Sequence, residues 1–235
     1  MKRFNNKLRV IIIFGPPGAG KGTQAELLEE RFGLYYLETS KIIEAHVMRA
    51  KLGEYVKVGN VKYFLAKEKK LWKTGILCSP PLVSYWVKEK VAELFSEGKG
   101  MLMAGSPRTL SEGKDQIPFL KKLYGAANIK VVLLELAPQQ TIWRNSHRRL
   151  CALLRHPILY NEETAGLRHC PFDGSRLIRR EGLDDPQTIK TRLREYTKRT
   201  FPLVQYFKSQ KLAVQKINGA QSAEDVFNDI LKALR

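Results

Sequence analysis

An apolar segment that ends abruptly at a glycine-rich loop constrains this chain of 235 residues more than any other feature. Residues 10–14 read Val-Ile-Ile-Ile-Phe, and such a continuous β-branched run predicts a strand buried on both faces. Three glycines follow and allow a tight turn whose N–H groups point inward: Gly15, Gly18 and Gly20. We therefore expect a buried strand that ends in a loop lined with backbone donors.

Lys21 follows this loop at the point where the chain enters a helix, predicted over residues 24–32. Inward amides, a helix N-terminus and one ammonium group together form a cradle for phosphate oxygens. The spacing from Gly15 to Lys21 fits the P-loop, although the hydroxyl of Thr23 comes one residue later than usual. The alternative, a structural turn without a ligand, fits the flanking strand and helix less well.

The length of the chain allows one domain with a substantial core and a small insertion. Hydrophobic residues make up 43% of it, but no apolar stretch approaches the roughly 20 residues that span a bilayer. The short apolar run behind the basic first residues opens into the glycine loop, so it does not resemble a signal peptide. Three cysteines do not make an even disulfide framework and favour a cytoplasmic protein: Cys78, Cys151 and Cys170.

A formal net charge of +18 is the unusual global property of this sequence. It is compatible with nucleic-acid binding, with an enzyme that holds two phosphorylated substrates, or with a solvated basic surface. Basic clusters such as residues 67–70 fit a solvated helix face best, and we find no signature of an RNA- or DNA-binding module. We expect incidental nucleic-acid affinity, no membrane association, and a monomer.

Strand-like runs alternate with helical stretches along most of the chain, which predicts an α/β fold with a parallel sheet and right-handed crossovers. The predicted strands cover residues 8–14, 35–37, 100–104, 129–136 and 212–217. A last helix is predicted over 223–234, with Ser222 as its cap. Two short helices, predicted over 39–51 and 61–73, interrupt the alternation. Ligands of such sheets bind at the carboxyl ends of the strands.

Residues 15–25, Gly-Pro-Pro-Gly-Ala-Gly-Lys-Gly-Thr-Gln-Ala, resemble the P-loop of adenylate kinases and related nucleoside monophosphate kinases, including its late threonine. The resemblance covers nearly the whole chain, and it implies a P-loop NTPase fold of three α/β/α layers around a five-stranded parallel sheet. The core would comprise residues 1–38, 79–150 and 184–235. A helical insertion at 39–78 would bind the nucleoside monophosphate, and residues 151–183 would form a lid.

The same resemblance implies ATP and Mg²⁺ as ligands, with the ATP phosphates on the glycine loop. The residues implied at the ATP site are Gly15, Pro17, Gly18, Ala19, Gly20, Lys21, Gly22, Thr23, Gln24, Arg144 and Gln221. Those implied at the acceptor site are Thr39, Gly105, Arg108, Arg180 and Arg192.

Arginines recur where the resembled family has them. Arg108 follows a predicted strand in a Pro-Arg-Thr motif, Arg144 and Arg148 share one helix face, and Arg192 opens an Arg-Leu-x-x-Tyr motif. Phosphoryl transfer needs fixed positive charge, positioning and exclusion of water more than covalent chemistry. No general base is required, and the residues expected to act on the transferring group are Lys21, Arg108, Arg144, Arg148 and Arg192.

Several positions around the acceptor pocket depart from the family pattern. Glu44 replaces an arginine that would hold the acceptor phosphate, with Lys41 or Arg49 as candidate substitutes. Ala104 replaces the aspartate that orients Mg²⁺ and its waters, although Mg²⁺ can be held mainly by phosphates and water. Glu112 replaces the glutamine that would read the acceptor base. The departures predict either altered acceptor specificity or weakened activity.

A metal site in the lid is indicated by four residues at short spacings: Cys151, His156, Cys170 and Asp173. Two such pairs of cysteine, histidine and acid can complete a tetrahedral Zn²⁺ shell, and some members of the resembled family carry a structural zinc there. His147 and His169 are alternative ligands. The other interpretation is a lid without metal, in which hydrogen bonds replace the ion.

The resemblance implies a nucleoside monophosphate kinase that transfers the γ-phosphoryl group of ATP, with AMP as the first candidate acceptor. Two alternatives stay open. One is a nucleotide-binding pseudo-kinase, with RNA as a candidate partner in view of the charge. The other is a P-loop kinase of a different small acceptor.

Overall fold

The structure is a computed structural model that describes residues 10–179 and 184–235. Its centre is a five-stranded sheet with the strand order β10-β6-β1-β5-β2, in which every pair is parallel. The strands are β1 (Val10–Phe14), β2 (Tyr35–Glu38), β5 (Met101–Ala104), β6 (Ile129–Glu135) and β10 (Val214–Asn218). The predicted five-stranded parallel sheet is confirmed, and the predicted first two residues of β1 lie outside the described part.

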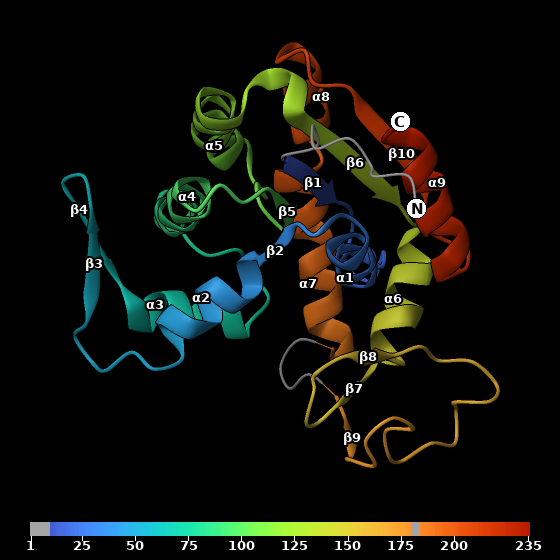
Figure 1. Cartoon of the computed structure of the whole chain (residues 1–235). Helices are drawn as coiled ribbons and strands as arrows, with labels where there is room; N and C mark the ends of the chain where they lie inside the picture. The colour runs from blue at the N-terminus through green and yellow to red at the C-terminus, as the bar shows by residue number, and fades with distance from the viewer. Residues whose placement is uncertain (1–9, 180–183) are drawn as a thin grey trace.

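Helices cover both faces of this sheet and give three layers (Figure 1). On one face lie α1 (Lys21–Phe32) and α9 (Ala223–Ala233). On the other lie α4 (Pro80–Ser96), α5 (Leu110–Tyr124) and α8 (Leu203–Ser209). α6 (Pro138–Ser146) and α7 (Pro186–Glu195) lead toward the lid, and α7 continues into a π turn (Tyr196–Thr200).

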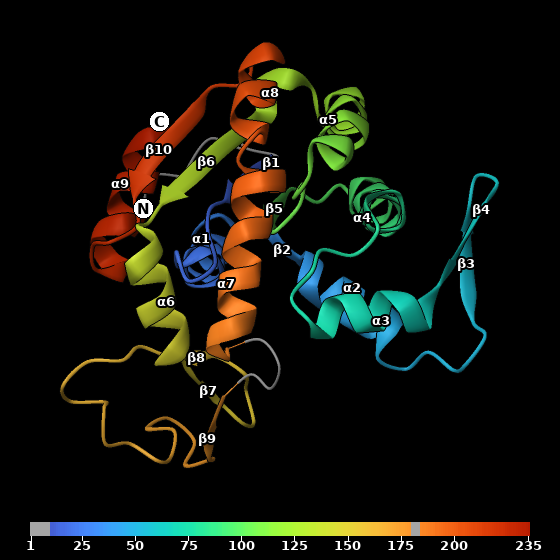
Figure 2. The same ribbon diagram turned by 180° about the vertical axis from the view of Figure 1, so that it is seen from behind.

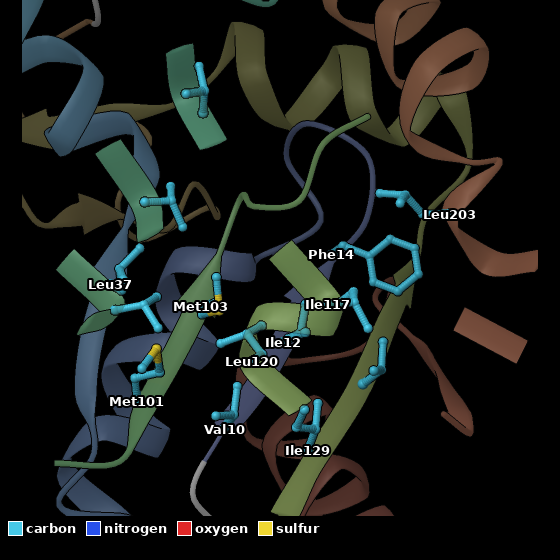
Figure 3. Close-up of a cluster of buried hydrophobic side chains, with 14 of the residues drawn as sticks. Val10, Ile12, Phe14, Leu37, Met101, Met103, Ile117, Leu120, Ile129 and Leu203 are labelled. Atoms are coloured by element: carbon cyan, nitrogen blue, oxygen red, sulfur yellow. The ribbon is translucent and has the colours of Figure 1, made fainter. Parts of the chain in front are cut away.

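Alternate residues of β1 face opposite layers, which explains its purely apolar sequence. Val10, Ile12 and Phe14 share one buried cluster with residues of α4, α5 and α8. Figure 3 shows them beside Ile117 of α5 and Leu203 of α8. The ring centroids of Phe14 and Phe207 lie 5.4 Å apart. Ile11 and Ile13 pack with α1 and α9 on the other side. A strand covered on both faces reads as a continuous hydrophobic run. Burial on both sides therefore fixes the end of β1, and the glycine loop that follows it, within the sheet.

The last helix is capped as predicted, because the Ser222 hydroxyl accepts a hydrogen bond from the Asp225 amide. The first helix begins at Lys21, three residues before the predicted start. Within the described part of the chain, none of the helices combines the length and the apolar character needed to span a bilayer.

The insertion after β2 contains a β-hairpin that the sequence interpretation missed. α2 (Thr39–Val47) and α3 (Leu65–Lys73) are present, but the predicted helix over 61–73 is wrong at its start. β3 (Tyr55–Val58) and β4 (Val61–Phe64) pair antiparallel instead. Aromatic and β-branched residues alternate with lysines on both sides of a Gly-Asn turn, and this period of two favours strands over a helix.

The lid is built from three short antiparallel strands. They are β7 (Arg149–Cys151), β8 (Pro157–Ile158) and β9 (Leu177–Ile178), in the order β8-β7-β9. Their small core consists of Cys151, Ile158 and Cys170. Figure 2 shows that the lid and the insertion after β2 extend from the core as two separate arms.

Candidate active site

The glycine loop between β1 and α1 packs so closely against its neighbours that side chains are excluded. A Cβ atom on Gly15 would collide with the carbonyl oxygen of Leu134, and one on Gly18 would lie 2.5 Å from the Asn145 side-chain amide. Both glycines have positive φ angles, +152° and +81°, which other residues rarely adopt. The loop is therefore held in one shape by β6 and α6.

Lys21 folds back over this loop. Its Nζ donates hydrogen bonds to the carbonyl oxygens of Gly15 and Pro16, at 2.9 and 2.8 Å. Lys21 is also the first residue of α1, whose N-terminus has no side-chain cap. An uncapped helix N-terminus beside an ammonium group is suited to bind phosphate oxygens.

An open cleft of about 820 Å³ lies at the carboxyl edge of the sheet and brings together three of the predicted cations, Lys21, Arg108 and Arg192. Four parts of the chain line it: the glycine loop, the segment after β5, the insertion, and α7 with its π turn. The lining residues are Phe14, Gly15, Pro17, Lys21, Ser40, Trp72, Gly75, Ile76, Leu77, Gly105, Pro107, Arg108, Arg192, Glu195, Tyr196 and Thr200.

Arg108 is fixed through its main chain on both sides. Its amide donates to the Glu112 carboxylate at 2.8 Å, and its carbonyl accepts from the Thr200 hydroxyl at 2.7 Å. Gly105 leaves room for the guanidinium, because a Cβ atom there would lie 2.7 Å from Nη2 of Arg108. The absence of a side chain at Gly105 therefore lets the arginine lie against the backbone inside the cleft.

Arg144 and Arg148 do not line the cleft. Arg144 donates to the carbonyl oxygens of Gly219 and Ala220, at 2.7 and 3.2 Å, and burial lowers its pKa. Arg148 donates to Asn145 at 2.7 Å and lies 3.9 Å from the buried carboxylate of Asp184. Arg144 lies in the last turn of α6, but the helix ends at Ser146 and Arg148 follows it. The prediction that both arginines share one helix face is therefore wrong, although both lie where the chain leads into the lid.

The other predicted contacts are placed as follows. Gln221 donates to the Asn218 carbonyl and to Asp229, and it does not line the cleft. Thr39 is fully buried at the start of α2, and among the described residues its hydroxyl finds no hydrogen-bond partner. Glu44 is exposed on α2 and lies outside the cleft lining. Arg180 lies outside the described residues.

The lid brings all four predicted metal ligands together. The donor atoms of Cys151, His156 and Cys170 lie within 4.8 Å of one another. The Cys151 thiol donates to the Asp173 carboxylate at 2.9 Å, and the Cys170 sulfur lies 3.4 Å from Nε2 of His156. The backbone amide of Leu154 also donates to the Cys151 sulfur, at 3.1 Å. Two thiols, an imidazole and a carboxylate are a donor set suited to tetrahedral zinc.

The two alternative histidines have other surroundings. His147 stacks on Trp143, with ring centroids 4.7 Å apart, and also contacts Tyr160. His169 pairs in an isolated bridge with Arg176. His156 is therefore the histidine that the fold directs toward the two thiols.

A family model described as adenylate kinase matches residues 13–212. The chain belongs to the adenylate kinase family. It is 32% identical over 228 residues to an adenylate kinase of Caldicellulosiruptor saccharolyticus, covering 95% of this chain and 98% of that protein. It is also similar to an adenylate kinase of Petrotoga mobilis, at 29% identity over 96% and 97% of the two chains. A third, from Clostridium botulinum, is 30% identical over 95% and 97%. The protein is thus a phosphotransferase of the nucleoside monophosphate kinase class.

Within this adenylate kinase fold, some cleft residues were not found by sequence reasoning, among them Trp72 and Thr200. Tyr196, which ends the predicted Arg-Leu-x-x-Tyr motif, also lines the cleft, and burial raises its pKa to about 12. Glu195 accepts from the Leu77 amide at 3.2 Å and so ties the end of the insertion to α7. These contacts join segments far apart in the sequence, so no local spacing indicated them.

Glu112 has a local structural role in this family member. It is 1% exposed, and its carboxylate accepts hydrogen bonds from the Arg108 amide and the Thr109 hydroxyl. Thr109 in turn accepts from the Glu112 amide at the start of α5, which gives a variant of the capping box in which the carboxylate reaches the amide one residue before the cap. The carboxylate is therefore engaged in holding Arg108 and the helix start.

We expect Glu112→Gln to change how stability depends on pH. Burial is the main cause of the raised pKa of Glu112. Because folding raises this pKa, Glu112 contributes fully to the free energy of unfolding below its pKa in the unfolded chain. This contribution is lost as pH rises through its pKa in the folded protein. As pH rises through the folded pKa of Glu112, the unchanged protein should lose unfolding free energy relative to Glu112→Gln. The loss should be about 1.4 kcal/mol for each unit by which folding raises that pKa.

Urea unfolding of both proteins across acid to neutral pH measures this difference. Glu97→Gln is the matched control, because hydrogen bonding to Lys99 lowers the pKa of Glu97. The difference in unfolding free energy between the unchanged protein and Glu97→Gln should therefore change with pH in the opposite direction. A difference between unchanged protein and Glu112→Gln that stays constant with pH would contradict the prediction.

Proposed function

We propose that this protein transfers the γ-phosphoryl group of ATP to AMP and so forms two molecules of ADP. The observation that carries the proposal is the convergence of Lys21, Arg108 and Arg192 on one cleft beside the glycine loop. Fixed cations there balance the spread-out negative charge of a phosphoryl group in transfer. The names of the similar proteins support AMP as the acceptor.

The donor phosphates would lie on the glycine loop and the N-terminus of α1. The N–H groups after Gly15 would cradle them, and Lys21 would exchange its bonds to the loop carbonyls for bonds to phosphate oxygens. Thr23, in the first turn of α1, would lie beside Mg²⁺. When bound, Mg²⁺ would supply positive charge that partly neutralises the phosphates, and Ala104 would offer it no side-chain ligand.

The acceptor would bind between the core and the insertion at residues 39–78. Arg108 would bridge the acceptor phosphate, because its main chain is held on both sides and its guanidinium lies in the cleft. Ser40, the neighbour of Thr39 at the start of α2, lines the cleft and supports an acceptor contact in this segment. No general base is assigned, since the acceptor phosphate is already a nucleophile.

Residues 151–183 would act as a lid. Arg144 and Arg148 lie where α6 meets this lid, so its movement would bring them toward the cleft that Arg192 lines. Arg144 would also hold the loop beside Gln221 against which the adenine of ATP would lie. Closure would exclude water and limit hydrolysis of ATP.

The three cysteines are free thiols, which supports a cytoplasmic setting in which thiolate metal ligands stay reduced.

A kinase of a different small acceptor is the second candidate function. It is favoured by Glu44, which offers no positive charge to a phosphate, and by Glu112, whose carboxylate is engaged at the start of α5. The two candidates differ in the acceptor alone and share the donor site.

The acceptor is tested by measuring ATP consumption with AMP, CMP, UMP, GMP and the deoxynucleoside monophosphates. We expect turnover with AMP to exceed that with each other acceptor. Turnover restricted to another acceptor would support the second candidate. ATP binding without turnover of any acceptor would contradict the proposed reaction.

Arg192→Lys should lower kcat by about 10²-fold or more with AMP and ATP, because a lysine cannot offer the two parallel N–H groups of a guanidinium. Arg194→Lys is the matched control, since Arg194 lies on the same helix, is exposed, and does not line the cleft. Steady-state kinetics of both variants measure the effect. Equal activities of the two variants would remove Arg192 from the proposed mechanism.

We further propose that the lid binds one structural Zn²⁺ through Cys151, His156, Cys170 and Asp173. Support comes from the close approach of their donor atoms and from the amide that donates to the Cys151 sulfur. The ion would replace the contacts among these side chains by four metal bonds. It would thereby stabilise a lid whose own hydrophobic core is small.

Metal analysis of the purified protein should find one zinc per chain, and chelation should lower the melting temperature. Cys170→Ser should lose the zinc, whereas Cys78→Ser should keep it, because Cys78 is buried in the main core away from the lid. A protein that purifies without zinc, and whose melting temperature does not respond to added zinc or to chelator, would support the lid without metal.

A further inference from the structure

The β3–β4 hairpin has no part in the reaction proposed above. None of residues 55–64 lines the cleft in the described part of the chain. The hairpin stands at the outer end of the insertion, away from the central sheet (Figures 1 and 2). Its surface is therefore available for a separate interaction.

The register of the hairpin gives it two chemically different faces. Tyr55 pairs with Phe64 and Lys57 with Lys62, and because side chains alternate along a strand these four share one face, here called the outer face. The opposite face includes Val56, Val58 and Tyr63, which pack against the main hydrophobic core. The inner face thus anchors the hairpin, while the outer face carries two aromatic rings and two ammonium groups.

The outer face is exposed and already brings rings and cations together. Tyr55 and Phe64 are 46% and 51% exposed, and their ring centroids lie 5.8 Å apart. Nζ of Lys62 lies 4.4 Å from the centroid of the Tyr55 ring. Among the described residues, neither Lys57 nor Lys62 has an acidic partner in an ion pair.

The surroundings of the outer face are also basic. Residues 48–73 contain eight lysines and arginines and two acids. One of these acids, Glu68, is buried and accepts hydrogen bonds from the amide and hydroxyl of Ser79. The other, Glu54, accepts from the Lys51 amide at 2.9 Å. The exposed side of the insertion therefore carries a strong local excess of positive charge.

We propose that the outer face of the hairpin binds single-stranded nucleic acid. Bases would stack on Tyr55 and Phe64, and backbone phosphates would pair with Lys57 and Lys62. Aromatic platforms interleaved with cations are the chemistry by which proteins bind single strands without strong sequence preference. A paired duplex would not offer its bases to the rings.

The arrangement favours a nucleic acid over a lipid surface. Lys57 and Lys62 share the face that carries the two aromatic rings. Inserting the rings into a membrane would press both ammonium groups toward the apolar layer, which is costly. A single strand presents bases and phosphates side by side and so satisfies both kinds of group.

Fluorescence anisotropy of the full chain with a labelled oligouridine of about 12 nucleotides tests the proposal. Tyr55→Thr/Phe64→Thr should weaken binding by about tenfold or more and leave the salt dependence unchanged. Lys57→Gln/Lys62→Gln should reduce the slope of log K against log salt by about 1.4, since each phosphate contact contributes about 0.7. Threonine replaces the two aromatic residues because it is favoured in β-strands and should preserve the hairpin.

Lys114→Gln/Lys122→Gln is the matched control, because it removes the same charge from exposed positions on α5 and should leave the affinity nearly unchanged. Melting temperature and kinase turnover of each variant verify that it folds. The proposal is overturned by absent binding, by an equal loss in the control pair, by binding only to anionic vesicles, or by a dimer that the aromatic variant abolishes. Because kinase turnover is measured separately from nucleic-acid binding, a failure of one proposal can be told apart from a failure of the other.

Discussion

The contact on which this structure depends is the return of Lys21 to the carbonyl oxygens of Gly15 and Pro16. It places an ammonium group over a loop whose shape is fixed from outside by Leu134 and Asn145. The loop in turn is held in place because β1 is buried on both faces. A hydrophobic strand thus anchors the polar turn, in which fixed amides and a cation lie together. Fixed donors of this kind are how a protein stabilises transferring charge at low cost.

One cation of the cleft, Arg108, is positioned through its main chain by contacts from a neighbouring and a distant segment. Arg108 is held between the capping box of α5 and the hydroxyl of Thr200, which lies in the π turn after α7. The buried carboxylate of Glu112 therefore affects the cleft through the backbone of Arg108.

Two insertions into one core carry different chemistry. The lid has a small hydrophobic core and gathers sulfur, nitrogen and oxygen donors, a set that suits a metal crosslink. The insertion after β2 anchors one hairpin face on the main core and exposes rings and lysines on the other. Some cations of this basic chain face the cleft, and others cover the hairpin and α3.

The sequence by itself determined the parallel sheet, the glycine loop and the residues that gather in the lid, because each depends on local spacing or on a strong hydrophobic run. The sequence interpretation missed the hairpin over 55–64, because its two strands have only four residues each and a helical pattern follows them directly. Only the tertiary structure decided that Trp72, Tyr196 and Thr200 join Arg108 in one cleft while Arg144 and Arg148 lie outside it. Those placements follow from packing between segments far apart in the chain, which the local periodicity of the sequence does not predict.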